Sequence, residues 1–224
     1  LHATPILKTE LIRILFRQPE EEDNSSFVFN HPLFHIRKDI KSCLFPPVFG
    51  EKVGPCNYWT ATISILTGIE LLASIYSGEE LAILAYKRNK ERNYKNFLDA
   101  YISKYGTISR QDKNSIWMLR NSLIHNSGLI GFNTKKKKRV YALSPDQTSS
   151  VLFDYCATQD YDILIYIYCL FAHFEKMVSF LKEYIENYSD LNENRFIHDM
   201  GGIIWTKTRS GGNASLVGRF TIVD

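Results

Sequence analysis

The sequence has few cysteines, and their spacing argues against several classes of protein. Its 224 residues include only Cys43, Cys56, Cys156 and Cys169. No two of them form a C-x-x-C pair, and none stands beside histidines at the spacing of a metal site. A disulfide framework would be unusual for a chain this long with so few cysteines, so we predict reduced thiols in or near the core. The sequence therefore predicts no metal site.

The usual enzyme signatures are also absent. The chain has no Walker loop, no G-x-G-x-x-G, no H-E-x-x-H and no G-x-S-x-G. We therefore expect no cofactor. The charge is nearly balanced, because 27 basic and 24 acidic side chains leave a net charge of +3. This excess is too small to identify a nucleic-acid-binding protein, so any argument for RNA depends on where the charges lie.

Long apolar runs are missing as well. The run from Ile163 to Ala172 is short, and the longer stretch from Tyr58 to Tyr76 contains Glu70. A membrane span needs about 20 predominantly apolar residues. The residues after Leu1 show no basic segment followed by an apolar one, so no signal peptide is visible. With 45% hydrophobic and 23% charged residues, we expect a folded, soluble, cytoplasmic protein with no membrane partner.

Helical periodicity dominates the rest of the sequence. Ser109, with Asp112 three residues later, is typical of a helix start. Asn57 is a second expected cap, and Pro46 and Pro47 end the first helix. The expected helices run approximately over Leu33–Leu44, Asn57–Tyr76, Glu79–Arg88, Tyr94–Tyr105, Ser109–His125 and Ile163–Ile185.

Two small β elements accompany these helices. A hairpin is expected at about 129–143, and alternating apolar residues after Arg195 predict a C-terminal β appendage. The fold class is thus mainly α. We divide the chain into a loosely structured N-terminal segment (1–32), a helical bundle with the inserted hairpin (33–188) and a β-rich extension (189–224).

One stretch carries residues suited to chemistry. The expected helix end contains Arg120, Asn121 and His125. Asn121 and His125 are four residues apart and share a helix face. Arg120 lies about 140° around the helix from His125, but its long side chain can turn toward the same region. The pattern offers a cation, an amide and an imidazole at one helix end.

This pattern resembles the HEPN family, whose mark is an arginine, four to six residues and a histidine near a helix end. Arg120, four intervening residues and His125 match it, and the polar Asn121 after the arginine is also typical. The resemblance implies an antiparallel helical bundle that pairs as a homodimer and cleaves RNA in a toxin or defence setting, held in check by an antitoxin or other partner. Ser127 stands where one branch of the family carries a tyrosine, so nucleotidylation of a tyrosine there is not supported.

The residue types suit metal-independent RNA cleavage. Attack by the 2′-hydroxyl needs a base, an acid for the leaving oxygen and a cation on the phosphate, and it leaves a 2′,3′-cyclic phosphate. Histidine titrates near neutral pH, and arginine binds phosphate oxygens bidentately. We therefore take Arg120, His125 and Asn121 as candidate catalytic residues, where a surface arginine and a helix-capping histidine are the alternative.

Other polar residues outside this motif have both a functional and a structural interpretation. Glu70 lies in an apolar helix, where a carboxylate needs a partner, and it either steers Arg120 or occupies an edge position. A basic run is either a charged hairpin tip or a phosphate contact: Lys135, Lys136, Lys137, Lys138 and Arg139. A second basic cluster, from Lys87 to Lys95, is interpreted as a solvated helix junction. His173 and the tyrosines Tyr94, Tyr101 and Tyr105 are expected in the core.

The sequence thus predicts a metal-independent endoribonuclease. The alternatives are a non-catalytic helical module that binds RNA or a protein partner through the basic hairpin, and a regulator that binds protein alone.

Overall fold

The structure is a computed structural model of the chain. It describes residues 4–19, 27–30, 32–46, 48–49, 52–53, 56–77, 86–126, 128–132, 138–155, 158–187, 204–208, 215–218 and 220–223. Within this part the fold is mainly helical, with small sheets, as the sequence predicts.

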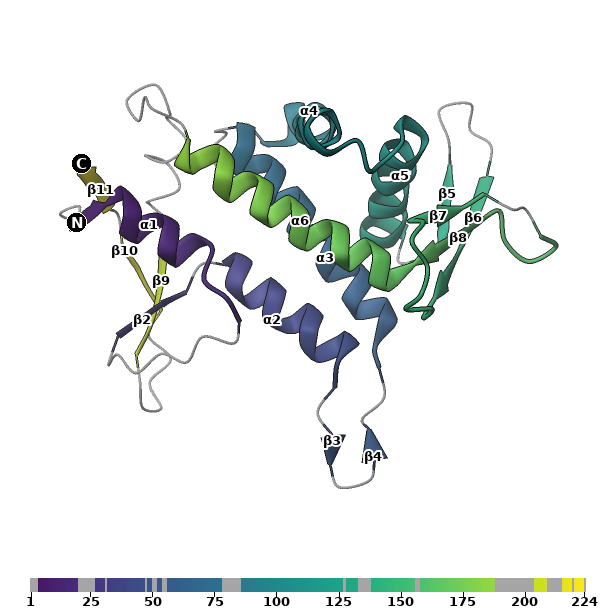
Figure 1. Ribbon diagram of the computed structural model, residues 1–224, viewed down its shortest axis with the longest axis horizontal. Coiled ribbons are helices and arrows are strands. Elements are labelled where there is room, and N and C mark those ends of the chain that lie inside the picture. Colours follow the sequence, from purple (N-terminus) through teal and green to yellow (C-terminus); the bar gives the residue numbers. More distant parts are fainter. Residues whose placement is uncertain are drawn as a thin grey trace.

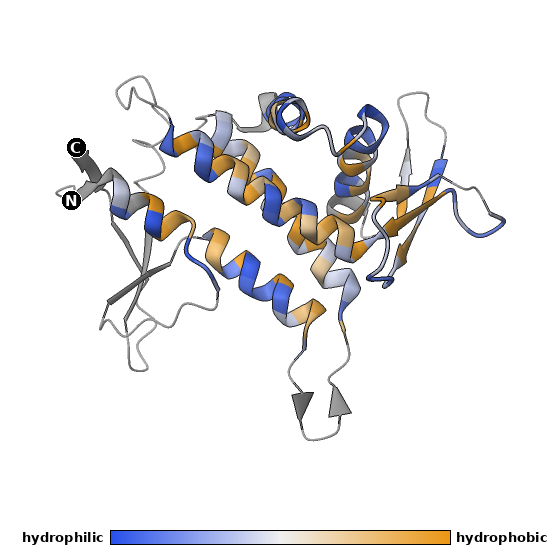
Figure 2. Cartoon of the chain, in the orientation of Figure 1, coloured by the Kyte–Doolittle hydropathy of each residue, from blue (hydrophilic) through white to orange (hydrophobic). Residues whose placement is uncertain are grey.

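Six helices occupy the described part of the chain. They are α1 (Lys8–Leu15), α2 (Pro32–Leu44), α3 (Tyr58–Ser77), α4 (Tyr86–Tyr105), α5 (Arg110–Asn126) and α6 (Ile167–Glu186). α3 packs against α2, α4, α5 and α6 and is therefore the central helix (Figure 1). Apolar residues gather along α3, α6 and the sheet beside α5, whereas outward-facing parts of α2 and α4 are hydrophilic (Figure 2).

Local signals position two of these helices. The side chain of Asn57 caps α3, because the backbone N–H of Thr60 donates to its Oδ1 at 3.1 Å. Ser109 and Asp112 form a capping box at the start of α5, with reciprocal hydrogen bonds of 2.9 and 3.0 Å. Both caps agree with the sequence prediction.

The middle of α3 is deeply buried. Gly68 allows α6 to approach closely, since a methyl group there would lie 2.6 Å from Cε2 of Phe174. α3 is long and apolar enough to cross a membrane, but 67% of its apolar window is buried inside the fold. Such burial is what a core helix of a soluble protein shows.

A four-stranded sheet lies beside the end of α5. It contains β5 (Ile130–Phe132), β6 (Lys138–Ser144), β8 (Ile163–Tyr166) and β7 (Phe153–Asp154), in that spatial order. β5 and β6 form the predicted hairpin, with Ile130 opposite Val140. β8 runs parallel to β6 and antiparallel to β7. The first residues of the predicted last helix are therefore a strand, and α6 begins only at Ile167.

The N-terminal residues differ from the prediction of a loosely structured segment over 1–32. β1 (Thr4–Leu7) and β2 (Phe27–Asn30) flank α1, and α1 buries Ile12 and Leu15. Short strands β3 (Val48–Phe49) and β4 (Lys52–Val53) pair between α2 and α3. Near the other end, β9 (Ile204–Thr208) pairs with β10 (Ser215–Gly218) and with β2, while β11 (Phe220–Val223) pairs with β1. Strands from the two ends of the chain therefore share sheets.

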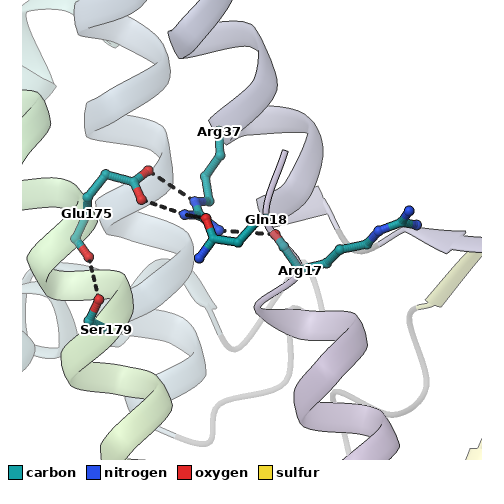
Figure 3. Close-up of polar contacts among 5 residues, drawn as sticks. All are labelled: Arg17, Gln18, Arg37, Glu175 and Ser179. Atoms are coloured by element: carbon teal, nitrogen blue, oxygen red, sulfur yellow. Dashed lines mark hydrogen bonds and ion pairs between the residues drawn. The ribbon is translucent and has the colours of Figure 1, made fainter. Parts of the chain in front are cut away.

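A buried arginine ties the N-terminal segment to the helices (Figure 3). Arg37 of α2 donates from Nε and Nη2 to the carboxylate of Glu175 in α6, at 3.0 and 2.5 Å. Its Nη1 donates to the carbonyl of Arg17 at 3.0 Å, and its Nη2 also donates to Oε1 of Gln18 at 2.8 Å. One guanidinium thus joins α2, α6 and the residues that follow α1.

Candidate functional site

The second half of α5 carries the residues of the R-x4-H pattern. Arg120 and Asn121 lie in the interior of the helix, and His125 is its penultimate residue. Beyond the helix, the Ser122 hydroxyl donates to the carbonyl of Gly128 at 2.6 Å. This bond closes the turn that leads from α5 into β5. The side chain of His125 lies outside the described residues, as does Ser127.

Arg120 is buried and engaged by a carboxylate. Its side chain is 2% exposed, and its Nε donates to Oε2 of Glu70 at 2.7 Å. Its Nη2 donates to the same oxygen, and the guanidinium lies 5.5 Å from the centroid of the Trp117 ring. The Nε/Nη2 edge, one of the two edges with which a guanidinium can bind a phosphate bidentately, is therefore occupied by Glu70. This contact accounts for the lone carboxylate inside an apolar helix, and the role of Arg120 as a phosphate ligand stays a prediction.

Asn121 is oriented by the same guanidinium. Nη1 of Arg120 donates to Oδ1 of Asn121 at 2.9 Å. Because arginine only donates, the amide oxygen must be the atom that faces it. The Nδ2 group consequently lies on the other arm of the amide. Asn121 is partly exposed.

Lys90 joins this arrangement from α4, which the sequence interpretation missed. Its Nζ is in ion-pair contact with Oε1 of Glu70, and its side chain is 24% exposed. The cluster from Lys87 to Lys95 was interpreted as a solvated junction, and no local pattern separates Lys90 from its basic neighbours. The signal that points to Lys90 is Glu70, because a buried carboxylate requires a cationic or hydrogen-bonding partner.

Two residues of the basic run, Lys138 and Arg139, lie among the described residues. Lys135, Lys136 and Lys137 lie outside the described residues. Lys138 is exposed at the first position of β6. Arg139 is partly neutralised, because its Nη1 lies 3.4 Å from Oδ1 of Asp162, and that carboxylate also accepts from the backbone N–H of Val140.

A separate polar pair joins α4 and α6. His173 is buried, and its Nδ1 lies 3.1 Å from the hydroxyl of Tyr101, which confirms the prediction of a hydrogen-bonded core histidine. Burial lowers the pKa of His173 from its ordinary value, and Lys176 lowers it further. Tyr94 is also in the core, but Tyr105 is exposed, contrary to expectation.

Three cysteines lie among the described residues. Burial is the main cause that raises the pKa of Cys169 and of Cys43. Both are free and partly buried, as is Cys56, which agrees with the prediction of reduced thiols near the core. Cys156 lies outside the described residues. Among the side chains that the structure describes, no three His, Cys, Asp or Glu residues are placed to hold a metal ion.

The geometry therefore brings together Glu70, Lys90, Arg120 and Asn121 from three helices. Among the described side chains, Arg120 and Lys90 both contact the carboxylate of Glu70. Such an arrangement can fix the last turns of α5. Comparison of the chain with protein-family models, curated proteins and solved structures finds no match.

Proposed function

We propose that this protein is a metal-independent endoribonuclease of the HEPN type. The observation that carries the proposal is the R-x4-H pattern at the end of α5, whose arginine is anchored by Glu70, a carboxylate that Lys90 also contacts. The mainly helical fold is compatible with a HEPN-like bundle. By the resemblance, two chains pair so that their motifs share a cleft, and a partner protein restrains a toxin or defence activity.

In the proposed reaction the RNA supplies its own nucleophile. The ribose 2′-oxygen attacks phosphorus while a base takes its proton, and the bond from phosphorus to the 5′-oxygen breaks as an acid protonates that oxygen. The products are a 2′,3′-cyclic phosphate and a 5′-hydroxyl, and no co-reactant is consumed. His125, on each of two paired chains, would take one of the two proton-transfer roles. Arg120 acts as a positioning residue, since its guanidinium is enclosed.

The test is cleavage of mixed RNA in EDTA by purified wild-type protein and by His125→Ala. We expect cleavage by the wild type, cyclic phosphate ends, and loss of cleavage in the variant. His35→Ala is the matched control, because His35 is an exposed histidine on α2. Far-UV circular dichroism must show that both variants fold. Equal cleavage by His125→Ala and wild type would sink the assignment.

The burial of Arg120 favours one second candidate, a non-catalytic helical module that binds RNA or a protein partner. In that case the Arg120–Glu70 pair only joins α5 to α3. RNA binding without cleavage would identify the RNA-binding form, and it would weaken when Lys138 and Arg139 are changed to glutamine. Light scattering adds a check, because the enzyme requires a dimer.

A further inference from the structure

β5 is the end strand of the four-stranded sheet beside α5 (Figure 1). Among the described strands it pairs with β6 alone. Ile130 lies opposite Val140, and the backbone N–H of Tyr141 donates to the carbonyl of Leu129 at 2.7 Å. In an antiparallel ladder this bond makes Ile130 and Val140 a non-hydrogen-bonded pair, so their N–H and C=O groups point away from each other.

The bonds of Val140 agree with this pattern. Its N–H donates to Oδ2 of Asp162 at 2.8 Å, and its carbonyl accepts from the N–H of Asp162 at 2.8 Å. Asp162 directly precedes β8, so both groups point toward that strand. The N–H and C=O of Ile130 therefore point to the outer side of β5, where the residues that the structure describes offer them no hydrogen-bonding partner. Such an edge can pair with another extended chain.

The side chain of Ile130 is accessible at the same edge. It is 41% exposed. Because side chains alternate along a strand, Ile130 and Val140 share one face of the sheet, while Gly131 and Tyr141 lie on the other. That other face packs on α5, since a methyl group at Gly131 would lie 3.6 Å from the carbonyl of Met118. Ile130 thus offers an apolar contact to an added strand.

Charge indicates which occupant suits this edge. Lys138 is exposed and lies opposite Phe132 in the hairpin, and the sequence directly before it adds Lys135–Lys137. A second copy of the chain would bring the same cations to one interface, which is unfavourable, and lysines beside an edge strand oppose self-association. The aliphatic Ile130 gives RNA bases no aromatic ring for stacking. A protein strand with carboxylates and apolar side chains fits both features.

We propose that the outer side of β5, here called the β5 edge, binds an extended acidic segment of a partner protein. The segment adds as a strand beside Ile130, places an apolar side chain against it and directs carboxylates toward Lys138. The β5 edge follows closely on the end of α5 at Asn126, so the partner would lie beside the helix end that carries the R-x4-H pattern. This inference goes beyond the proposed function and does not depend on RNA cleavage.

The experiment selects binders from a displayed library of random peptides on the full chain. Fluorescence anisotropy then measures the affinity of the selected peptides after labelling with fluorescein. We expect an excess of Asp and Glu among them, with apolar residues at alternate positions. Ile130→Pro should weaken their binding at least about tenfold, because proline removes the outward N–H without removing a bond to β6. Ile130→Val keeps that N–H and should bind like the wild type.

A charge reversal provides the second variant. Lys138→Glu should weaken binding about fivefold. Lys176→Glu is its matched control, because Lys176 is an exposed lysine on α6, and it should leave binding unchanged. If circular dichroism shows that Ile130→Pro does not fold, hydrogen exchange in the wild type decides instead. The selected peptide must then slow exchange of the Ile130 amide.

Four results would overturn the proposal. They are the selection of no peptide, the absence of an acidic excess, equal binding by Ile130→Pro and wild type, and unchanged exchange of the Ile130 amide. A dimer seen by light scattering and lost in Ile130→Pro would assign the β5 edge to a second copy and would also overturn it. Cleavage of RNA by the wild type tests the proposed function separately, so failure of one leaves the other standing.

Discussion

Removal of the Glu70 carboxylate should destabilise the fold strongly. Glu70→Leu removes the carboxylate that Nε and Nη2 of Arg120 contact, while the Arg120 side chain is only 2% exposed. Breaking a buried ion pair from one side costs about 3–5 kcal/mol. For a chain of this size that cost corresponds to a loss of roughly 6–20 °C in melting temperature. Urea unfolding followed by circular dichroism measures the free energy directly.

The same geometry predicts an asymmetry between the two partners. Arg120→Met leaves Glu70 in contact with Lys90, so the remaining charge keeps a partner and the cost should be nearer to about 2 kcal/mol. The double variant Glu70→Leu/Arg120→Met removes both buried charges and should be more stable than Glu70→Leu alone.

The reasoning would be refuted by the reverse order of stabilities. If Arg120→Met unfolds as readily as Glu70→Leu, Lys90 does not compensate Glu70. If the double variant loses the sum of the two single losses, the residues do not act as a pair. Lys95→Gln serves as a control, with an expected change within about 0.5 kcal/mol because Lys95 forms an i,i+4 surface pair with Glu91 on α4.

Three further perturbations test other parts of the fold. Gly68→Ala should destabilise by about 1–3 kcal/mol in urea unfolding, because the added methyl group would lie 2.6 Å from Cε2 of Phe174; no change would mean that α6 can shift. The lowered pKa of His173 means that the unfolded chain binds more protons, so stability is full above the ordinary pKa of 6.5 and falls as pH drops below it. Melting curves should show this fall in wild type and less of it in His173→Gln; identical pH profiles would contradict it. Ser109→Ala removes the hydroxyl that accepts from the backbone N–H of Asp112, so it should cost about 1 kcal/mol, and an unchanged urea midpoint would argue against the cap.

Features that depend on local sequence were predictable. The capping box of Ser109 and Asp112 specifies the start of α5 through neighbouring residues alone. Asn57 does the same for α3. The hairpin of β5 and β6 also joins segments close in the chain. These signals need no knowledge of the tertiary structure.

The sequence predictions were wrong for elements whose structure depends on residues that are distant in the sequence. The run Ile163–Tyr166 fits a helical spacing, but it forms a strand because β6 offers it a parallel partner. α1 has only eight residues, too few for a stable isolated helix, and it is stabilised by burial of its apolar face. The two helices expected over 79–105 are described as one, α4, from Tyr86, while 78–85 lie outside the described residues.

The same distinction between local signals and distant partners applies to the candidate site. Arg120, Asn121 and His125 were identified because they are close in sequence, and Glu70 was noted because a carboxylate in an apolar helix needs a partner. Lys90 lies 20 residues beyond Glu70 and 30 before Arg120, and only the packing of α4 and α5 against α3 brings the three together. A contact of that kind leaves no periodic pattern in the sequence.

The burial of Arg120 changes what the R-x4-H pattern implies for this chain. A guanidinium that donates from Nε and Nη2 to one carboxylate joins α5 to α3 whether or not RNA is cleaved. Arg120 therefore fits both the enzyme and the binding module, and loss of function in Arg120→Ala would not distinguish them. The distinction depends on His125, because cleavage of RNA by the wild type and its loss in His125→Ala would separate the enzyme from the binding module.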